Sequence, residues 1–239
     1  MSPLVLVHGA FSNHVTNWEL VLPLFEERFA VRAVARRGRG GVPATEGHSV
    51  EDEARDVVRV IRAAGTPVFL LGHSYGAHVA LAAAAMEPAR VRKLVLYEPP
   101  WPHLLTQRAM ARLEGLAAEE DWDAFAAWFF SEILGVPADE LKALRASAQW
   151  PPIVADGPAT LGDFRALYRY RFNPADFGGL SLPVLLQAGT ESPAGLYVTA
   201  ALLSEIPGSR LGMLEGQAHE GMTTAPEQYA QMVTAFLEN

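Results

Sequence analysis

The chain has 239 residues, of which 50% are hydrophobic and 19% are charged, and its formal net charge is -8. This much apolar material can build a core, which excludes global disorder, and the acidic balance disfavours general nucleic-acid binding. The sequence contains no cysteine, so disulfides and cysteine-ligated metal sites are excluded. The only basic run, Arg36, Arg37 and Arg39, is interpreted as a solvated loop rather than a phosphate site.

The N-terminal segment reads Met-Ser-Pro-Leu-Val-Leu-Val-His-Gly. It lacks the charged start and the apolar length of a signal peptide, and no stretch approaches the roughly 18 apolar residues of a membrane span. We therefore expect a soluble, cytoplasmic protein that does not bind membranes. The pattern leaves open whether it is a monomer or a homodimer.

Short apolar runs alternate with helical patterns along the chain. Six runs rich in Val and Leu predict strands, at residues 4–7, 30–34, 68–71, 91–97, 184–187 and 210–214. They lack a regular polar alternation, which is typical of strands covered on both faces. Helices are expected at 49–64 and at the C-terminus, where Ser49 with Asp52 and Thr224 with Glu227 resemble capping boxes. The alternation predicts an α/β fold, with a mostly parallel sheet of about six strands flanked by helices.

Residues 99–179 interrupt this alternation. Helical patterns cover 108–116, 121–134, 138–148 and 160–170, and the segment contains four of the five tryptophans. We expect a helical cap on a core formed by residues 1–98 and 180–239. Part of the aromatic surface must pack the cap onto the core, and Trp101 and Trp128 are the candidate substrate-binding residues.

The segment Gly72-His73-Ser74-Tyr75-Gly76 lies between an apolar run and an alanine-rich stretch, Ala77 to Met86. A strand, a sharp turn and a helix are the setting of a nucleophile elbow. The glycines allow close backbone approach, and the strained serine presents its hydroxyl beside a helix N-terminus. The motif predicts Ser74 as a nucleophile, and the alternative is an ordinary glycine-rich turn.

An acyl-transfer site also needs two backbone N–H donors for the oxyanion and a general base. Tyr75 follows the nucleophile and would supply one donor. The second is expected from the loop after the first strand, from Ala10 with Phe11 as its neighbour. His219 lies on the last loop before the final helix and is the predicted base. No paired-histidine spacing indicates a metal site.

Several motifs occur in a fixed order along the chain: His-Gly after the first strand, Arg-Arg-Gly-Arg-Gly, Gly-His-Ser-Tyr-Gly, Tyr-Glu-Pro-Pro and Gly-Gln-Ala-His. This order resembles the α/β-hydrolase superfamily, in particular its small, cofactor-free serine esterases and haloperoxidase-like members. The resemblance covers the chain outside the insertion, which corresponds to the family's cap, and it implies that no cofactor is used. The chain opens on what would be the family's third strand.

The acid of the triad departs from the family pattern. The family usually places Asp after the penultimate strand, where this chain has Ser192. A serine lacks the negative charge that stabilises an imidazolium. Some superfamily members carry the acid after the preceding strand, which favours Glu98 in this chain. Glu191 is the second candidate for the acid. The third possibility is a site that has no acid beside the histidine.

These residues predict a serine hydrolase of the carboxylesterase type, with a small or medium apolar ester, lactone or thioester as substrate and an acyl-enzyme on Ser74. A small-molecule substrate is the only partner expected. The turn at His8-Gly9-Ala10-Phe11 does not match a dinucleotide-binding turn. Two alternatives remain, because fold alone does not determine function: a lyase or cyclase that uses the same triad, and a ligand-binding pseudoenzyme.

Overall fold

Six parallel strands form the central sheet of the computed structural model, which describes all 239 residues. The strand order is β2-β1-β3-β4-β5-β6. The strands are β1 (Ser2–Val7), β2 (Phe29–Val34), β3 (Val68–His73), β4 (Val91–Tyr97), β5 (Val184–Gly189) and β6 (Arg210–Leu214). The predicted fold class and the six strands are confirmed. Both ends of every strand lie within two residues of the predicted boundaries.

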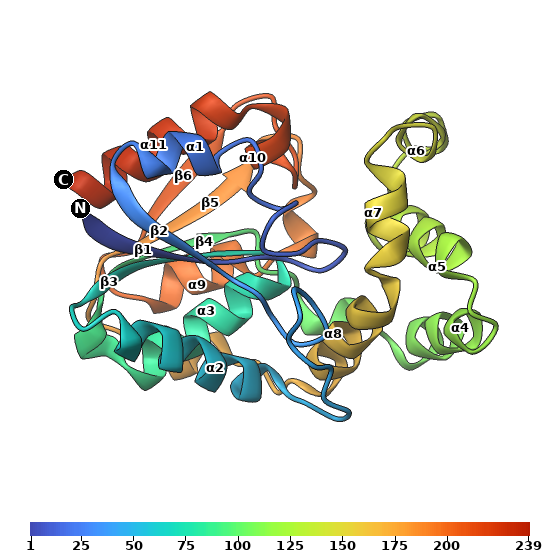
Figure 1. Ribbon diagram of the computed structural model, residues 1–239, viewed down its shortest axis with the longest axis horizontal. Helices are drawn as coiled ribbons and strands as arrows, with labels where there is room; N and C mark the ends of the chain where they lie inside the picture. Colours follow the sequence, from blue (N-terminus) through green and yellow to red (C-terminus); the bar gives the residue numbers. More distant parts are fainter.

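Helices cover both faces of the sheet (Figure 1). One face carries α1 (Leu22–Glu26), α10 (Gly221–Thr224) and α11 (Pro226–Glu238), and the other carries α2 (Val50–Ala63), α3 (Tyr75–Met86) and α9 (Thr199–Glu205). Successive residues of β1 belong to different apolar clusters: Leu4 and Leu6 pack with α1 and α11, and Val5 and Val7 with α2 and α3. Burial on both faces explains why the strands show no polar alternation.

The two predicted capping boxes have different outcomes. Ser49 caps α2, and its side chain and that of Asp52 each accept the other residue's backbone N–H, as predicted. The prediction for Thr224 and Glu227 is wrong. Helix α11 begins at Pro226 without a side-chain cap, because Thr224 ends α10 and its hydroxyl bonds to the Gln217 side chain instead.

The chain between β4 and β5, residues 99–179, is called the helical insertion below. It lies beyond the carboxyl ends of the strands (Figure 1). It contains α4 (Gln107–Ala118), α5 (Trp122–Trp128), a π-helical turn (Phe129–Ile133), α6 (Ala138–Arg145), α7 (Trp150–Ala155) and α8 (Gly157–Arg169), with short 3₁₀ turns at Pro102–Leu104 and Pro174–Phe177. The π-helical turn shortens the long helix predicted at 121–134. Helix α7 was not predicted, and its prolines lie in the first turn, where proline is compatible with a helix.

The basic run after β2 is buried rather than solvated. Arg36 and Arg39 are 3% and 4% exposed. Both pair with Asp163 of the insertion, and Arg36 also pairs with Glu53 of α2. The predicted solvated loop is therefore wrong for these two residues, because carboxylates distant in the sequence compensate their charges. Only Arg37 is partly exposed, where it pairs with Asp56.

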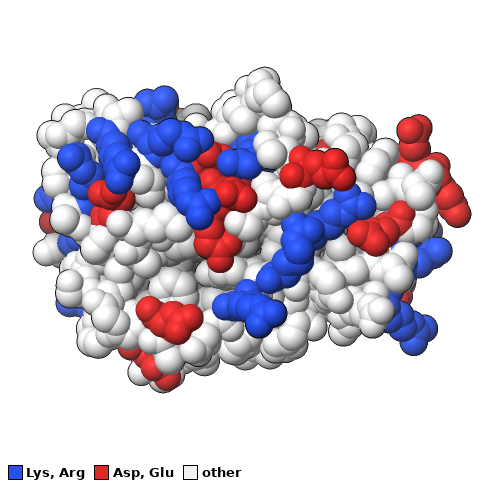
Figure 2. All heavy atoms as spheres, turned by 90° about the horizontal axis from the view of Figure 1, so that it is seen from below, with Lys and Arg blue, Asp and Glu red and all other residues white.

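Some exposed arginines pair within their own helix. On α2, Arg55 pairs with Asp52 and Arg59 with Asp56, each three residues away. The face shown in Figure 2 accordingly carries basic and acidic side chains close to one another. None of the helices combines the length and the apolar character that a membrane-crossing helix requires.

Buried histidines predict a loss of stability in acid. Burial lowers the pKa of His8 and His73, and it lowers the pKa of His78 from 6.5 to about 4. Below pH 6.5 the unfolded chain takes up protons at these residues and the folded chain does not. We expect His78 alone to remove about 3 kcal/mol of the free energy of unfolding between pH 6.5 and pH 4.

Urea unfolding at several pH values in this range measures the effect. The variant His78→Gln keeps a donor for the Pro100 carbonyl, which His78 Nε2 contacts at 2.6 Å, and it should show a shallower pH dependence. His103→Gln alters an exposed histidine and is the matched control. Equal slopes for wild type and His78→Gln would contradict the prediction.

Candidate active site

The turn from β3 to α3 has the geometry of a nucleophile elbow. Ser74 has φ 55° and ψ -125°, a strained conformation for a residue with a side chain. Its N–H donates to the Tyr97 carbonyl at 2.9 Å. A Cβ atom at Gly76 would lie 2.2 Å from the His8 carbonyl oxygen, and one at Gly72 would lie 2.6 Å from the Gly76 oxygen. Both glycines are therefore required where the motif has them.

Glu98 lies directly beside His219. His219 Nδ1 is 2.7 Å from Glu98 Oε2, and the other oxygen, Oε1, accepts the Gly189 N–H at 2.8 Å. Glu98 is fully buried and has a positive φ of 47°. A carboxylate only accepts hydrogen bonds, so Nδ1 carries the proton and Nε2 is left as the acceptor. Burial alone would lower the pKa of His219, but the hydrogen bond and charge of Glu98 outweigh it and raise this pKa.

Glu191 takes no part in this arrangement. Its side chain is exposed and makes no hydrogen bond, and only its backbone N–H is engaged, with the Gln217 carbonyl at 2.9 Å. Ser192, in the family's usual acid position, has a buried hydroxyl without a partner. Of the two carboxylates considered from the sequence, the structure brings Glu98 to the His219 ring.

Two tyrosines that the sequence analysis missed hold the His219 loop. The Tyr197 ring stacks on the His219 ring, with centroids 5.1 Å apart and planes at 14°. The Tyr97 hydroxyl donates to the Ala218 carbonyl and accepts the Gly221 N–H at 3.2 Å. Tyr97 directly precedes Glu98 in the sequence, and this position could have indicated that Tyr97 lies near the site. No pattern marked Tyr197, which reaches the site through a β-bridge with Pro100.

The loop after β1 lies against the nucleophile. A Cβ atom at Gly9 would be 3.0 Å from Ser74 Cβ. The Ala10 N–H makes no hydrogen bond within the protein, and the Tyr75 N–H is the first of α3, where amides have no helical partner. The N–H of the neighbouring Phe11 is already engaged, because it donates to Thr160 Oγ1 at 2.9 Å. Ala10 and Tyr75 are the two remaining predicted donors.

Neither of the two predicted substrate-binding tryptophans contacts the His219 ring. The rings that contact His219 are those of His73, Tyr97 and Tyr197. Trp101 instead lines a hollow of about 430 Å³, together with Pro102, His103, Leu105, Thr106, Tyr168, Tyr170, Arg171 and Phe172. Trp128 packs against the larger apolar cluster.

Other aromatic side chains of the insertion do reach the loop after β1. Phe129 and Phe130 lie in the π-helical turn, and the centroid of each ring is 5.3 Å from the centroid of the Phe11 ring. A π-helical turn is often found at functional sites. Here it places two consecutive aromatic side chains against the residue that follows Ala10.

Two groups of histidines and carboxylates are close enough to share a metal ion: His73 with His219 and Glu220, and His48 with Glu53 and Asp163. In the first group both His73 nitrogens contact oxygen atoms, of Asn17 and of the His219 backbone. In the second, Asp163 pairs with two arginines. Neither group offers a free set of ligands.

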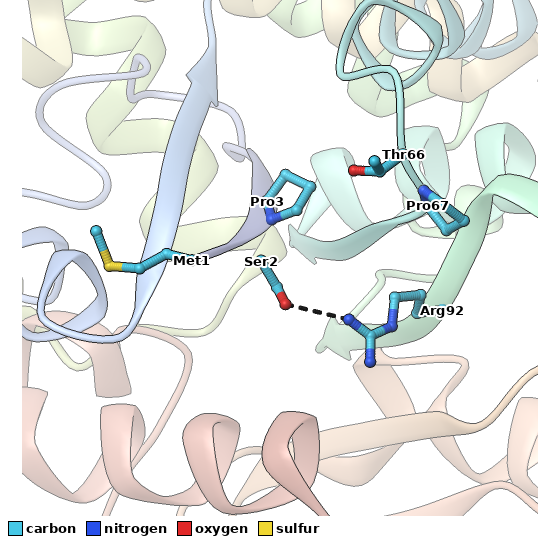
Figure 3. A pocket seen from close by; sticks show the side chains of 6 residues that line it. All are labelled: Met1, Ser2, Pro3, Thr66, Pro67 and Arg92. Carbon is cyan, nitrogen blue, oxygen red and sulfur yellow. Dashed lines mark hydrogen bonds between the residues drawn. The ribbon is translucent and has the colours of Figure 1, made fainter.

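A hollow of about 630 Å³ lies at the opposite end of the sheet (Figure 3). It is lined by Met1, Ser2, Pro3, Thr66, Pro67 and Arg92, and Arg92 donates to the Ser2 hydroxyl at 3.1 Å. These residues lie at the amino ends of the strands and include no base beside a nucleophile. Ligands of parallel α/β sheets bind at the carboxyl ends, where Ser74, Glu98 and His219 lie.

Comparisons with known proteins agree with this geometry. The model of the alpha/beta hydrolase family matches residues 4–232. A 2-(acetamidomethylene)succinate hydrolase of Mesorhizobium japonicum is 30% identical over 99% of this chain and 88% of its own length. A pimeloyl-(acyl-carrier protein) methyl ester esterase of Methylococcus capsulatus is 30% identical over 69% of this chain and 66% of its own.

Among solved structures, an alpha/beta hydrolase from Sphaerobacter thermophilus superposes with a TM-score of 0.84 at 30% identity, over 99% of this chain and 92% of that chain. The match therefore includes the sheet, the elbow and the helical insertion. With a family model that spans nearly the whole sequence and relatives that are hydrolases, the chain belongs to the alpha/beta hydrolase family.

Proposed function

We propose that the protein is a serine hydrolase that cleaves a small or medium apolar ester, lactone or thioester through an acyl-enzyme on Ser74. The observation that carries this proposal is the 2.7 Å contact between His219 Nδ1 and the buried carboxylate of Glu98, at the sheet edge where Ser74 is held in the elbow. Relatives named as hydrolases and esterases support it. The helical insertion acts as the cap over this site.

In the proposed cycle, His219 Nε2 removes the proton from the Ser74 hydroxyl as its oxygen attacks the substrate carbonyl carbon. The resulting imidazolium is stabilised by Glu98, and the N–H groups of Ala10 and Tyr75 bind the oxyanion. His219 then gives the proton to the leaving oxygen or sulfur, and the acyl group stays on Ser74. Water, deprotonated by His219, releases the acid and regenerates the serine.

The surroundings of the oxyanion loop support an uncharged acyl group. The Mesorhizobium relative is named for a succinate derivative, which carries carboxylates. Arg36 and Arg39 are the arginines that belong to the hydrogen-bond network of the loop in this chain. Both are already buried in ion pairs with carboxylates of the protein, so neither is free to bind a substrate carboxylate. The rings of Phe11, Phe129 and Phe130 provide an apolar wall instead.

Labelling by a fluorophosphonate tests the proposed nucleophile. We expect the wild type to be labelled at Ser74 and Ser74→Ala to remain unlabelled, because only an activated serine attacks phosphorus readily. A panel of p-nitrophenyl esters of increasing chain length then measures the acyl preference. An unlabelled wild type would contradict the mechanism. A labelled Ser74 without ester hydrolysis would favour a lyase or cyclase that uses the same residues.

A further inference from the structure

The two peptide groups on either side of Ala10 are each held by a side chain from outside the loop. The Gly9 carbonyl oxygen accepts a hydrogen bond from Arg36 Nη2 at 2.8 Å. The Phe11 N–H donates to Thr160 Oγ1 at 2.9 Å. Arg36 follows β2, and Thr160 lies on α8 of the helical insertion. The Gly9 oxygen also contacts His8 Nδ1 at 2.8 Å and accepts from the Ser12 hydroxyl at 3.3 Å. Neighbouring residues and residues distant in the sequence therefore set the orientation of the loop together.

These contacts determine where the Ala10 N–H points. The Gly9 carbonyl and the Ala10 N–H belong to one trans peptide, which is planar, so the oxygen and the hydrogen point in opposite directions. Binding of the oxygen to Arg36 directs the Ala10 N–H away from Arg36. On the other side Phe11 has a positive φ of 53°, a strained conformation that persists only where the surroundings hold it. The bond to Thr160 supplies such a restraint.

Thr160 itself has no free hydrogen-bonding capacity. A threonine hydroxyl has one proton and two lone pairs. The proton is donated to Asp156 Oδ2 at 3.1 Å, and the oxygen accepts from Phe11 and from Arg39 Nη2, the latter at 3.2 Å. The hydroxyl is buried, so its position is determined on every side.

Both anchors belong to one buried ion cluster. Asp163 lies three residues after Thr160 on α8 and accepts from Arg36 and Arg39, each at 2.8 Å. Arg36 also donates to Glu53 at 2.7 Å and, through Nε, to the His8 carbonyl at 3.0 Å. A buried network whose members are all paired is rigid. The cluster thus joins α2, the basic run and α8 to the loop after β1.

We infer that Arg36 and Thr160 are positioning residues that aim the Ala10 N–H at the reacting oxygen, so that the helical insertion completes the oxyanion hole through Thr160. This inference rests on the proposed serine hydrolase function. A cluster that only attaches the insertion to the core would affect stability and substrate binding. A cluster that orients the donor affects stabilisation of the oxyanion, which appears in kcat rather than in KM.

Three variants separate the two roles. Thr160→Val keeps the shape of the side chain but removes the acceptor of the Phe11 N–H, and Thr160→Ser retains the hydroxyl. Thr106→Val is the matched control: Thr106 also accepts a backbone N–H of the insertion, that of Ala109 at 3.1 Å, but it has no contact with the loop after β1. We expect Thr160→Val to lower kcat by about 10- to 100-fold with KM little changed.

A trifluoromethyl ketone, which forms an oxyanion on the serine, should bind Thr160→Val more weakly by a similar factor. Thr160→Ser should restore both kcat and inhibitor binding, and Thr106→Val should retain the wild-type values of both. A Thr160→Val enzyme whose kcat falls no further than that of Thr106→Val would overturn the inference.

Amide hydrogen exchange provides a readout that does not depend on turnover. The Phe11 amide should exchange slowly in the wild type and in Thr160→Ser, and rapidly in Thr160→Val. Equal exchange in all three would overturn the positioning role, whether or not the protein hydrolyses esters. An unlabelled Ser74 would instead overturn the proposed function, so the two failures are distinguishable.

Discussion

Replacing Glu98 with Gln is expected to lower turnover on the order of 10⁴-fold. The amide has nearly the same shape, and its oxygen can still accept the Gly189 N–H that Glu98 Oε1 now accepts at 2.8 Å. It lacks the negative charge that stabilises the imidazolium, and it no longer fixes the proton on His219 Nδ1. The folded structure should survive, whereas the base becomes ineffective.

Steady-state kinetics on a p-nitrophenyl ester, together with a thermal melt of the same sample, measures this effect. Glu191→Gln is the matched control, because Glu191 is exposed and its side chain has no partner. The pH profile gives an independent signature. Since Glu98 raises the pKa of His219 above its ordinary value of 6.5, the acid limb of kcat/KM should shift to lower pH in Glu98→Gln. A Glu98→Gln enzyme with near-wild-type turnover would exclude Glu98 as the acid.

The second large effect concerns stability. Asp163→Asn should lower the free energy of unfolding by about 3–5 kcal/mol, the usual result of removing one partner of a buried ion pair. Asp163 is fully buried and is shared by Arg36 and Arg39. Burial opposes ionisation of this carboxyl, but the two guanidinium charges outweigh it and lower its pKa. The amide would leave two buried positive charges with less compensation.

Urea unfolding at pH 7 measures the difference. Glu114→Gln is the control. Glu114, on α4, pairs at 3.0 Å with Arg165, which lies on α8 like Asp163, but both side chains of this pair are exposed. A surface pair of this kind contributes about 1 kcal/mol or less. If Asp163→Asn destabilised the protein no more than Glu114→Gln, the cluster would not contribute to stability in the way its burial implies.

The features that could be predicted from the sequence are those with a local signature. A strand buried on both faces is a short apolar run, so all six strands were found. The elbow needs glycine at fixed positions around Ser74, and the structure shows close backbone contacts at Gly72 and Gly76. Glu98 could be proposed because it directly follows β4, the strand after which some members of the family carry the acid.

The features that were missed depend on contacts between distant segments. Arg36 and Asp163 are 127 positions apart, so nothing near the basic run indicated that it would be buried. The partner of the Phe11 N–H, Thr160, lies in the insertion, so no local pattern indicated that this N–H would be engaged. Trp101 and Trp128 were selected by residue type, and no local signal indicated that Phe129 and Phe130 would lie against Phe11.

The attachment of α8 to the core has a consequence for the path of the substrate. If α8 moved away from the sheet, the pairs of Asp163 with Arg36 and Arg39 would separate, and breaking buried pairs costs several kcal/mol. A movement of the insertion that kept these pairs intact would therefore involve α4 to α7, which lie furthest from the sheet (Figure 1). Helix α8 would remain in place during such a movement. The proposed oxyanion hole, which includes the loop held by Thr160 of α8, would then stay assembled.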